Sequence, residues 1–161
     1  MKVIYALIAV FCIVFCGYAE TPAVMFDDAF SLVLPEEWLE CEPAEGIDES
    51  MLVACMSDGQ TTITITKGTI PDRNTDIEAY ALQLQENGHA DAFISAFSDA
   101  EDAPQFIFYS DPENSVACCS TLIHEKGVYT FSFAPVAADA EYGQKILDMM
   151  ATFTIPYTEV E

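Results

Sequence analysis

The stretch from Leu52 to Thr66, "LVACMSDGQTTITIT", decides how the chain begins to fold. It places two runs of strand-forming residues, "LVACMS" and "TTITIT", on either side of Asp58-Gly59. An Asp-Gly pair between such runs favours a two-residue hairpin loop, because both central residues of the preferred turn must accept positive φ. The sequence therefore predicts that the two runs pair as antiparallel strands.

Turn residues divide the later part of the chain in the same way. The sequence "DPEN" at 111–114 separates "QFIFYS" from "SVACCSTLI", and "EKG" at 125–127 separates that run from "VYTFSFAP". Pro112 suits the first central position of a turn, since its ring fixes φ. The segment from Gln105 to Pro135 is therefore predicted to form a three-stranded antiparallel meander.

Two helices are predicted around these strands. In "TDIEAYALQLQENGH" Thr75 can cap the first turn with Glu78 as its partner, and Gly88 stands where a glycine ends a helix. The second helix, "DAEYGQKILDMMATF", contains Gly143 as its weak point. Apolar residues at helical spacing give each helix one buried side: Ile77, Tyr80, Ala81 and Leu84 in the first, and Tyr142, Ile146 and Met149 or Met150 in the second.

The first nineteen residues, "MKVIYALIAVFCIVFCGYA", are typical of a secretory signal peptide. Lys2 precedes an apolar run from Val3 to Cys16, and the small residues Gly17 and Ala19 predict cleavage between Ala19 and Glu20. Two alternatives stay open. A lipoprotein signal would use Cys16 as the lipidated residue, although Phe15 stands where a small residue is usual. An uncleaved anchor would need about twenty apolar residues, slightly more than this run provides.

The remaining chain, 20–161, is expected to form a single domain without internal repeats and to be a monomer. Signal cleavage removes Lys2, one of five basic residues, so the 27 acidic residues face four basic ones and the net charge changes from −22 to −23. Such a charge excludes nucleic acid and anionic membrane surfaces as partners, because phosphate binding needs clustered Lys and Arg. It favours an acidic surface that keeps an exported protein soluble, with a basic partner or divalent cations as alternatives.

The segment "FSLVLPEEW", in which Phe30, Leu32, Leu34, Pro35 and Trp38 follow in order, resembles the opening of the PsbP-like superfamily. The hairpin, the start of the first helix and the ending "YTFSFAP … YGQKILDMMATF" match that pattern in turn, so the resemblance spans roughly residues 26–155. It implies an α+β fold in which helices flank an antiparallel sheet as an α/β/α sandwich. The photosystem member supports a manganese cluster and nuclear relatives bind a small GTPase, whereas many bacterial members are exported proteins with no assigned activity.

Catalytic and metal-binding patterns are weak in this sequence. His89 and His124 have no partner at metal-ligand spacing, the four cysteines after residue 19 form no zinc pattern, and neither a Gly-x-Ser-x-Gly elbow nor a phosphate-binding glycine loop occurs. No catalytic, cofactor-binding or metal-binding residue and no cofactor is therefore predicted. Acidic loops leave calcium binding or a carboxylate hydrolase open; these loops contain Asp99, Glu101, Asp102, Asp111, Glu113 and Asn114.

The adjacent cysteines Cys118 and Cys119 must point to opposite faces of a strand, so they cannot serve one site together. We interpret both as small core side chains, with a bond from one of them to a distant cysteine as the alternative. Cys41 and Cys55 lie on runs that an antiparallel pairing would bring opposite each other. These two are the pair expected to form a disulfide if the protein matures under oxidising conditions.

Taken together, these patterns predict an exported or envelope-associated, strongly acidic, non-catalytic accessory or binding domain whose partner is an unknown protein or envelope component. The competing hypothesis is a small secreted enzyme, either a thiol oxidoreductase that uses Cys118 or Cys119 or a carboxylate-dependent hydrolase. No membrane span is expected in the chain that follows the signal peptide.

Overall fold

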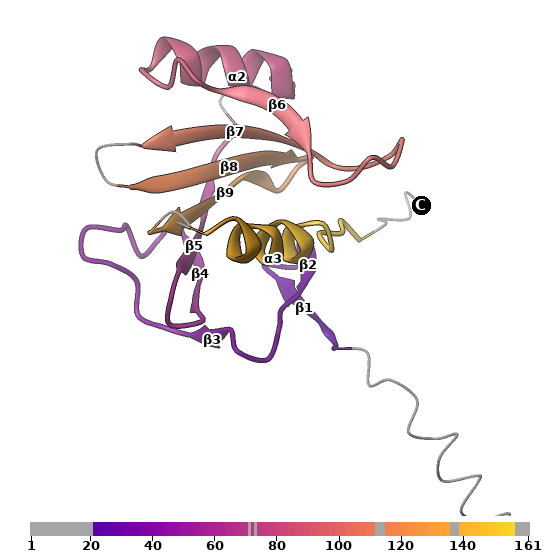
Figure 1. Cartoon of the computed structure of the whole chain (residues 1–161). Helices are drawn as coiled ribbons and strands as arrows, with labels where there is room; N and C mark the ends of the chain where they lie inside the picture. The colour runs from indigo at the N-terminus through magenta and orange to yellow at the C-terminus, as the bar shows by residue number, and fades with distance from the viewer. Residues whose placement is uncertain (1–20, 71, 73, 112–114, 136–138, 157–161) are drawn as a thin grey trace, which may run out of the picture.

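A computed structural model describes residues 21–70, 72, 74–111, 115–135 and 139–156 (Figure 1). The predicted signal peptide, Cys16 and the Ala19–Glu20 cleavage site lie outside these residues. The elements are, in chain order, β1 (Ala23–Phe26), β2 (Phe30–Val33), β3 (Leu39–Glu40), β4 (Leu52–Ser57), β5 (Thr62–Gly68), α2 (Ile77–Glu86), β6 (Phe93–Ala96), β7 (Gln105–Asp111), β8 (Val116–Ile123), β9 (Gly127–Ala134) and α3 (Ala140–Met150).

The main sheet has seven strands in the order β3-β4-β5-β9-β8-β7-β6, and all neighbouring strands are antiparallel. The predicted β4–β5 hairpin and the β7–β8–β9 meander are both confirmed. The two units join because β5 pairs with β9 along its whole length, from Thr62 opposite Ala134 to Gly68 opposite Val128. β1 and β2 form a separate two-stranded hairpin.

The turn of the β4–β5 hairpin differs from the prediction. Ser57 pairs with Thr62, so the loop contains the four residues 58–61, and the expected two-residue loop is wrong. Within this loop, only Gly59 has a positive φ, of 87°. The carboxylate of Asp58 stabilises this longer turn by accepting hydrogen bonds from the backbone N–H groups of Gln60 and Thr61, each at 2.9 Å.

The two helices lie on opposite faces of the sheet. Phe106 and Ile107 are consecutive residues of β7, so their side chains point to opposite faces, and both are buried. Ile107 packs with Ala81 of α2, whereas Phe106 belongs to the cluster that contains Met149 and Met150 of α3. Figure 1 shows α2 beside β6 and β7 and α3 near β1 and β2. The layers are therefore α/β/α, as predicted.

The cap of the first helix differs by one residue from the prediction. Asp76, not Thr75, is the N-cap of α2, and its carboxylate accepts a hydrogen bond from the backbone N–H of Ala79 at 2.8 Å. Gly88 follows the helix with a φ of 108°, as a glycine that ends a helix does. α3 also begins at an aspartate, because Asp139 accepts hydrogen bonds from the first turn.

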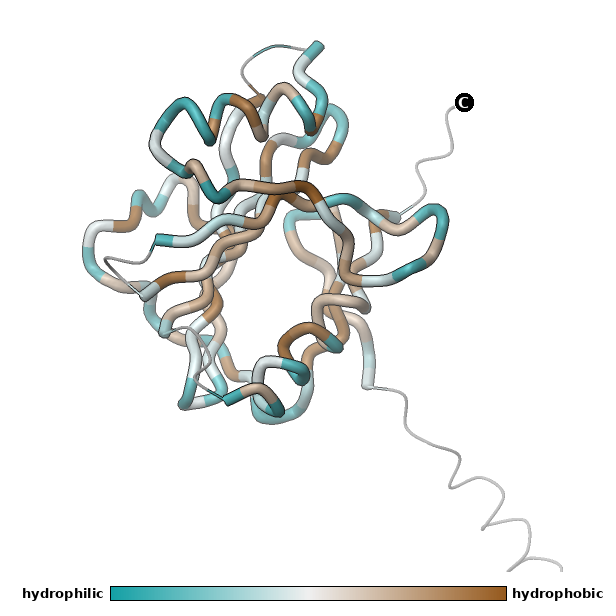
Figure 2. The backbone as a smooth tube through the Cα atoms, turned by 45° about the horizontal axis from the view of Figure 1, so that its top comes forward, coloured by the Kyte–Doolittle hydropathy of each residue, from teal (hydrophilic) through white to brown (hydrophobic). Residues whose placement is uncertain are grey.

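The core is built on aromatic side chains from distant parts of the chain. Phe30 of β2 is fully buried, and its ring lies 5.3 Å from Tyr129, 5.4 Å from Phe131 and 5.0 Å from Phe153, measured between centroids. Ser31 pairs with Thr154, which closes β2 against the segment after α3. Figure 2 shows hydrophilic residues gathered at the peripheral loops. The buried apolar members of "FSLVLPEEW" are Phe30, Leu32, Leu34 and Trp38.

Candidate functional site

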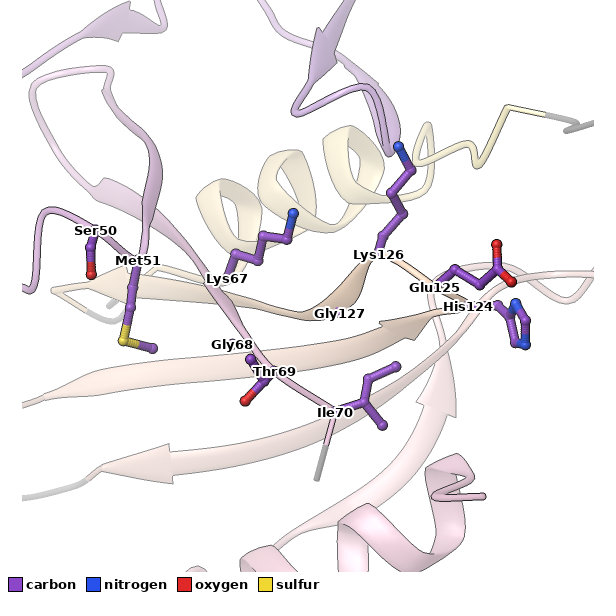
Figure 3. Close-up of a pocket in the computed structure, with 10 residues that line it drawn as sticks. All are labelled: Ser50, Met51, Lys67, Gly68, Thr69, Ile70, His124, Glu125, Lys126 and Gly127. Carbon is purple, nitrogen blue, oxygen red and sulfur yellow. The ribbon is translucent and has the colours of Figure 1, made fainter. Parts of the chain in front are cut away.

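An open pocket of about 1100 Å³ lies where the end of β5 meets the turn between β8 and β9 (Figure 3). The pairing of β5 with β9 brings residues 67–70 beside residues 124–127, and Ser50 and Met51 complete the lining. Gly127 has a φ of 140°, and a Cβ atom there would lie 2.5 Å from the carbonyl oxygen of Gly68. Glycine at this position therefore permits the close backbone approach that shapes the pocket.

Two lysines meet at this pocket, together with the acidic residue Glu125. Of the three lysines in the described residues, Lys67 and Lys126 line the pocket and Lys145 does not, and His124 lines it as well. Figure 3 shows the ammonium groups of Lys67 and Lys126 extending to the same side of the β5–β9 ribbon, away from Met51. Two cationic side chains in one place are unusual in a chain with a net charge of −22.

Lys67 is held by the turn between β1 and β2. Its Nζ lies 2.7 Å from Oδ2 of Asp27, and the hydroxyl of the buried Tyr129 donates to the same oxygen at 2.6 Å. The hydrogen bond from Lys67, followed by that from Tyr129, lowers the pKa of Asp27. The same bond with Asp27 raises the pKa of Lys67, so both partners are ionised at neutral pH.

Lys126 differs from Lys67 in its surroundings. Its side chain is exposed and makes no hydrogen bond or ion pair with another of the described residues. Lys67 forms an ion pair with Asp27, whereas Lys126 acts on Asp27 only through its charge, which also lowers the pKa of that carboxyl; Lys126 is therefore the ammonium group with free hydrogen-bonding capacity for an incoming ligand. The arrangement can bind an anionic group of a ligand or partner. The sequence analysis missed Lys67 and Lys126, because only the β5–β9 pairing brings them together.

A second pocket, of about 350 Å³, lies between α3 and the sheet. Its lining is mostly apolar. The helix contributes Ala140, Gly143, Gln144, Ile146 and Leu147, and the facing surface contributes Phe97, Phe108, Ala117, Cys118, Cys119 and Phe133. Small mostly apolar pockets with few polar groups are typical of small-molecule sites. Sequence analysis noted Gly143 only as a weak point of the helix.

Cys41 and Cys55 meet across the β3–β4 pair, as the predicted strand pairing requires. The backbone N–H of Cys41 donates to the carbonyl of Cys55 at 2.9 Å, and their Sγ atoms lie 3.0 Å apart. This separation is near that of a disulfide but not at it, and both are free thiols here. Burial, followed by the hydrogen bond with Cys55, raises the pKa of Cys41 to about 11.

Cys118 and Cys119 lie on opposite faces of β8. Cys119 is buried in the α3-side cluster, and burial raises its pKa well above the ordinary value. Cys118 is half-buried, with its Sγ 3.6 Å from the hydroxyl oxygen of Ser132, and burial raises its pKa too. A reactive cysteine needs a lowered pKa, so these surroundings disfavour thiolate chemistry at either residue.

The histidines and acidic residues that the sequence offered as candidates do not come together in one site. His89 packs against Tyr109 with ring centroids 4.7 Å apart, whereas His124 lines the pocket of Figure 3. Asp99, Glu101 and Asp102 lie between β6 and β7, and Glu113 and Asn114 lie outside the described residues. Within the described ranges, no group of three or more His, Cys, Asp or Glu side chains is placed to hold a metal ion. Nor does any described helix combine the length and the apolar character needed to span a membrane.

The layers and strand order define the class of protein, an α+β sandwich in which helices cover both faces of an antiparallel sheet. The solution structure of cyanobacterial PsbP (CyanoP) from Synechocystis sp. PCC 6803 is similar, with a TM-score of 0.50 and 12% sequence identity over 87% of this chain and 96% of that chain. The chain therefore has the PsbP-like fold. No protein-family model and no curated protein matches the sequence. At 12% identity, the similarity shows the fold alone.

Proposed function

We propose that the chain is an exported, strongly acidic, non-catalytic binding or accessory domain that contacts an envelope component or protein through the pocket of Figure 3. The observation that carries this proposal is the placement of Lys67 and Lys126 at one pocket in a chain of net charge −22. An anionic group is repelled by most of an acidic surface, so a local cationic site can direct it to one place. The apolar run before Ala19 supports export.

The thiols support a binding function over a thiol oxidoreductase. Burial raises the pKa of Cys118 and of Cys119, so both stay protonated at neutral pH. A thiol that attacks a disulfide must be a thiolate for part of the time. Neither Cys118 nor Cys119 has surroundings that would stabilise a thiolate.

The contact is tested by comparing Lys126→Ala with Lys145→Ala. Both remove one exposed lysine, but only Lys126 lines the pocket. Each immobilised protein is incubated with envelope fractions at low salt, and the bound components are quantified by mass spectrometry. We expect a component that binds wild type and Lys145→Ala but is lost with Lys126→Ala. Equal recovery with both variants would contradict a contact at this pocket.

Export is tested by the intact mass of the protein recovered outside the cytoplasm. We expect a chain that begins at Glu20, because Gly17 and Ala19 suit the signal peptidase. A mature chain that begins at a lipid-modified Cys16 would contradict cleavage at Ala19 and would show that the protein is anchored to a membrane.

A further inference from the structure

The pocket beneath α3 is distinct from the site of the proposed function, and two of the five helix residues that line it, Ala140 and Gly143, have little or no side chain. Ala140 and Gly143 face β8 and β9 where a larger residue would fill the space. Glycine in a helix interior is less favourable than alanine, because it loses more backbone freedom on folding. Gly143 is therefore placed where it weakens the helix and at the same time leaves the pocket open.

The sheet side of the pocket supplies aromatic contacts. The rings of Phe97 and Phe108 meet edge to face with centroids 5.0 Å apart, and the exposed ring of Phe93 stacks on Phe108 at 5.5 Å. Leu147, which is 46% exposed, lines the pocket on the helix side. The apolar surface thus extends from the inside of the pocket to the solvent.

One carboxylate of α3, that of Asp148, gives the edge of this pocket a negative charge. Gln144 is the amide side chain in the lining, and its Nε2 donates to Oδ1 of Asp148 at 2.8 Å. Asp148 follows Gln144 by four residues, so its carboxylate lies beside the lining at this point. Glu141 and Lys145, which are four residues apart, both lie further round the helix, away from the side that Ala140, Gly143 and Leu147 share.

We propose that this pocket binds a small hydrophobic amine. The hydrocarbon part lies against Phe97, Phe108 and Gly143, and the ammonium group pairs with Asp148 at the edge. The volume of about 350 Å³ is within the range of small-molecule sites. The negative charge of the edge and of the whole chain disfavours an anionic amphiphile of the same length.

The test compares octylamine, octanol and octanoate, which share one chain length and differ in head-group charge. Displacement of the neutral fluorescent probe N-phenyl-1-naphthylamine from the full-length mature protein reports the affinity of each. We expect octylamine to bind up to about fivefold more tightly than octanol, as for a partly exposed ion pair, and octanoate to bind most weakly. Octanoate binding as tightly as octylamine would overturn the charge argument.

Variants distinguish binding inside the pocket from non-specific binding of amines to an acidic protein. Gly143→Leu fills the pocket from the helix and improves helix propensity, and Ala117→Leu fills it from the sheet; both should abolish saturable binding in proteins that still melt cooperatively. Asp148→Asn should reduce octylamine binding to the level of octanol, whereas Glu78→Gln, which removes a charge on α2, should leave it unchanged. Octylamine binding that survives both leucine variants, or no binding of any probe to wild type, would refute the proposal.

Discussion

At the scale of single residues, Asp27 connects the β1–β2 hairpin to the sheet. Its Oδ2 accepts hydrogen bonds from the ammonium of Lys67 and the hydroxyl of Tyr129, and Tyr129 is fully buried. A buried hydroxyl without a partner costs free energy, so Asp27 also satisfies a group of the core. Asp27 and the neighbouring Asp28 each have a φ of 50°, a conformation that aspartate and asparagine tolerate better than most residues.

Asp27→Asn should lower stability at neutral pH. The folded-state pKa of Asp27 lies below its unfolded value, so its contribution is present above the unfolded pKa and is lost as the pH falls through the folded pKa. The loss at pH 7 should be about 1 kcal/mol or less, since the carboxylate is 37% exposed. Thermal melts from pH 7 to pH 3 should show the difference from wild type shrinking below about pH 4.

Asp28→Asn is the matched control for this prediction. It changes the same charge in the same turn and keeps the same backbone preference, but no hydrogen bond joins Asp28 to Lys67 or Tyr129. Its melting temperature at pH 7 should equal or slightly exceed that of wild type, because it removes one repelling charge without breaking a contact. A pH dependence that is equal for both variants would show that the turn's charge, and not the contacts of Asp27, decides stability.

Cys41 and Cys55 should form a disulfide when the protein is exported into an oxidising compartment. Their backbones are hydrogen-bonded and their Sγ atoms lie 3.0 Å apart, so a small adjustment closes the bond. The chain-entropy model gives about 3 kcal/mol of stabilisation for a loop of this length. Peptide mapping without reduction should recover Cys41 linked to Cys55. Recovery of Cys41 linked to Cys118 or Cys119 would contradict this pairing.

At the scale of the elements, the strands could be predicted more reliably than their ends. Alternation and turn residues are local signals, which is why the β4–β5 hairpin and the meander agree with the structure. The turn was predicted as too short because Asp58 uses its side chain to accept two backbone N–H groups. The predicted cap, Thr75, and the observed cap, Asp76, differ because both neighbouring residues have side chains that can cap a helix.

The cap of α2 gives a direct test at this scale. Asp76→Ala removes the side-chain oxygen that accepts the Ala79 N–H, and it should cost about 1 kcal/mol in the free energy of unfolding. Thr75→Ala should change it by less than half that amount, because Thr75 does not cap the helix. Urea denaturation of both variants measures the two losses. A larger loss in Thr75→Ala would assign the cap to Thr75 after all.

Neither pocket could be predicted from the sequence. Lys67 and Lys126 are 59 positions apart in the sequence, and they become neighbours only through the register in which β5 pairs with β9. Ala117 and Gly143 come from a strand and a helix whose packing depends on the whole α3-side core. Local patterns report which residues form an element, whereas a pocket depends on how elements far apart in sequence are brought together.

At the scale of the whole molecule, net charge is the dominant physical feature. The chain carries 27 acidic against five basic residues, and one ion pair, Lys67 with Asp27, is present within the described residues. Repulsion among carboxylates on a folded surface exceeds repulsion in an expanded chain, because folding brings the charges closer together. The folded state is therefore stabilised by anything that screens or neutralises these charges.

Adding salt at pH 7 should accordingly raise the melting temperature, and so should a pH nearer 5, at which some carboxylates begin to be protonated. A triple variant, Glu36→Gln, Glu45→Gln and Glu49→Gln, tests the cause, because these side chains are exposed and make no hydrogen bond within the described part of the chain. The variant should melt above wild type at low salt, and the difference should vanish as salt increases, since screening removes the repulsion that the substitutions relieve. Differential scanning calorimetry over a range of NaCl concentrations measures both effects. A melting temperature of wild type that falls steadily with added salt would mean that attractive ion pairs outweigh the repulsion, and the acidic surface would then need a different explanation.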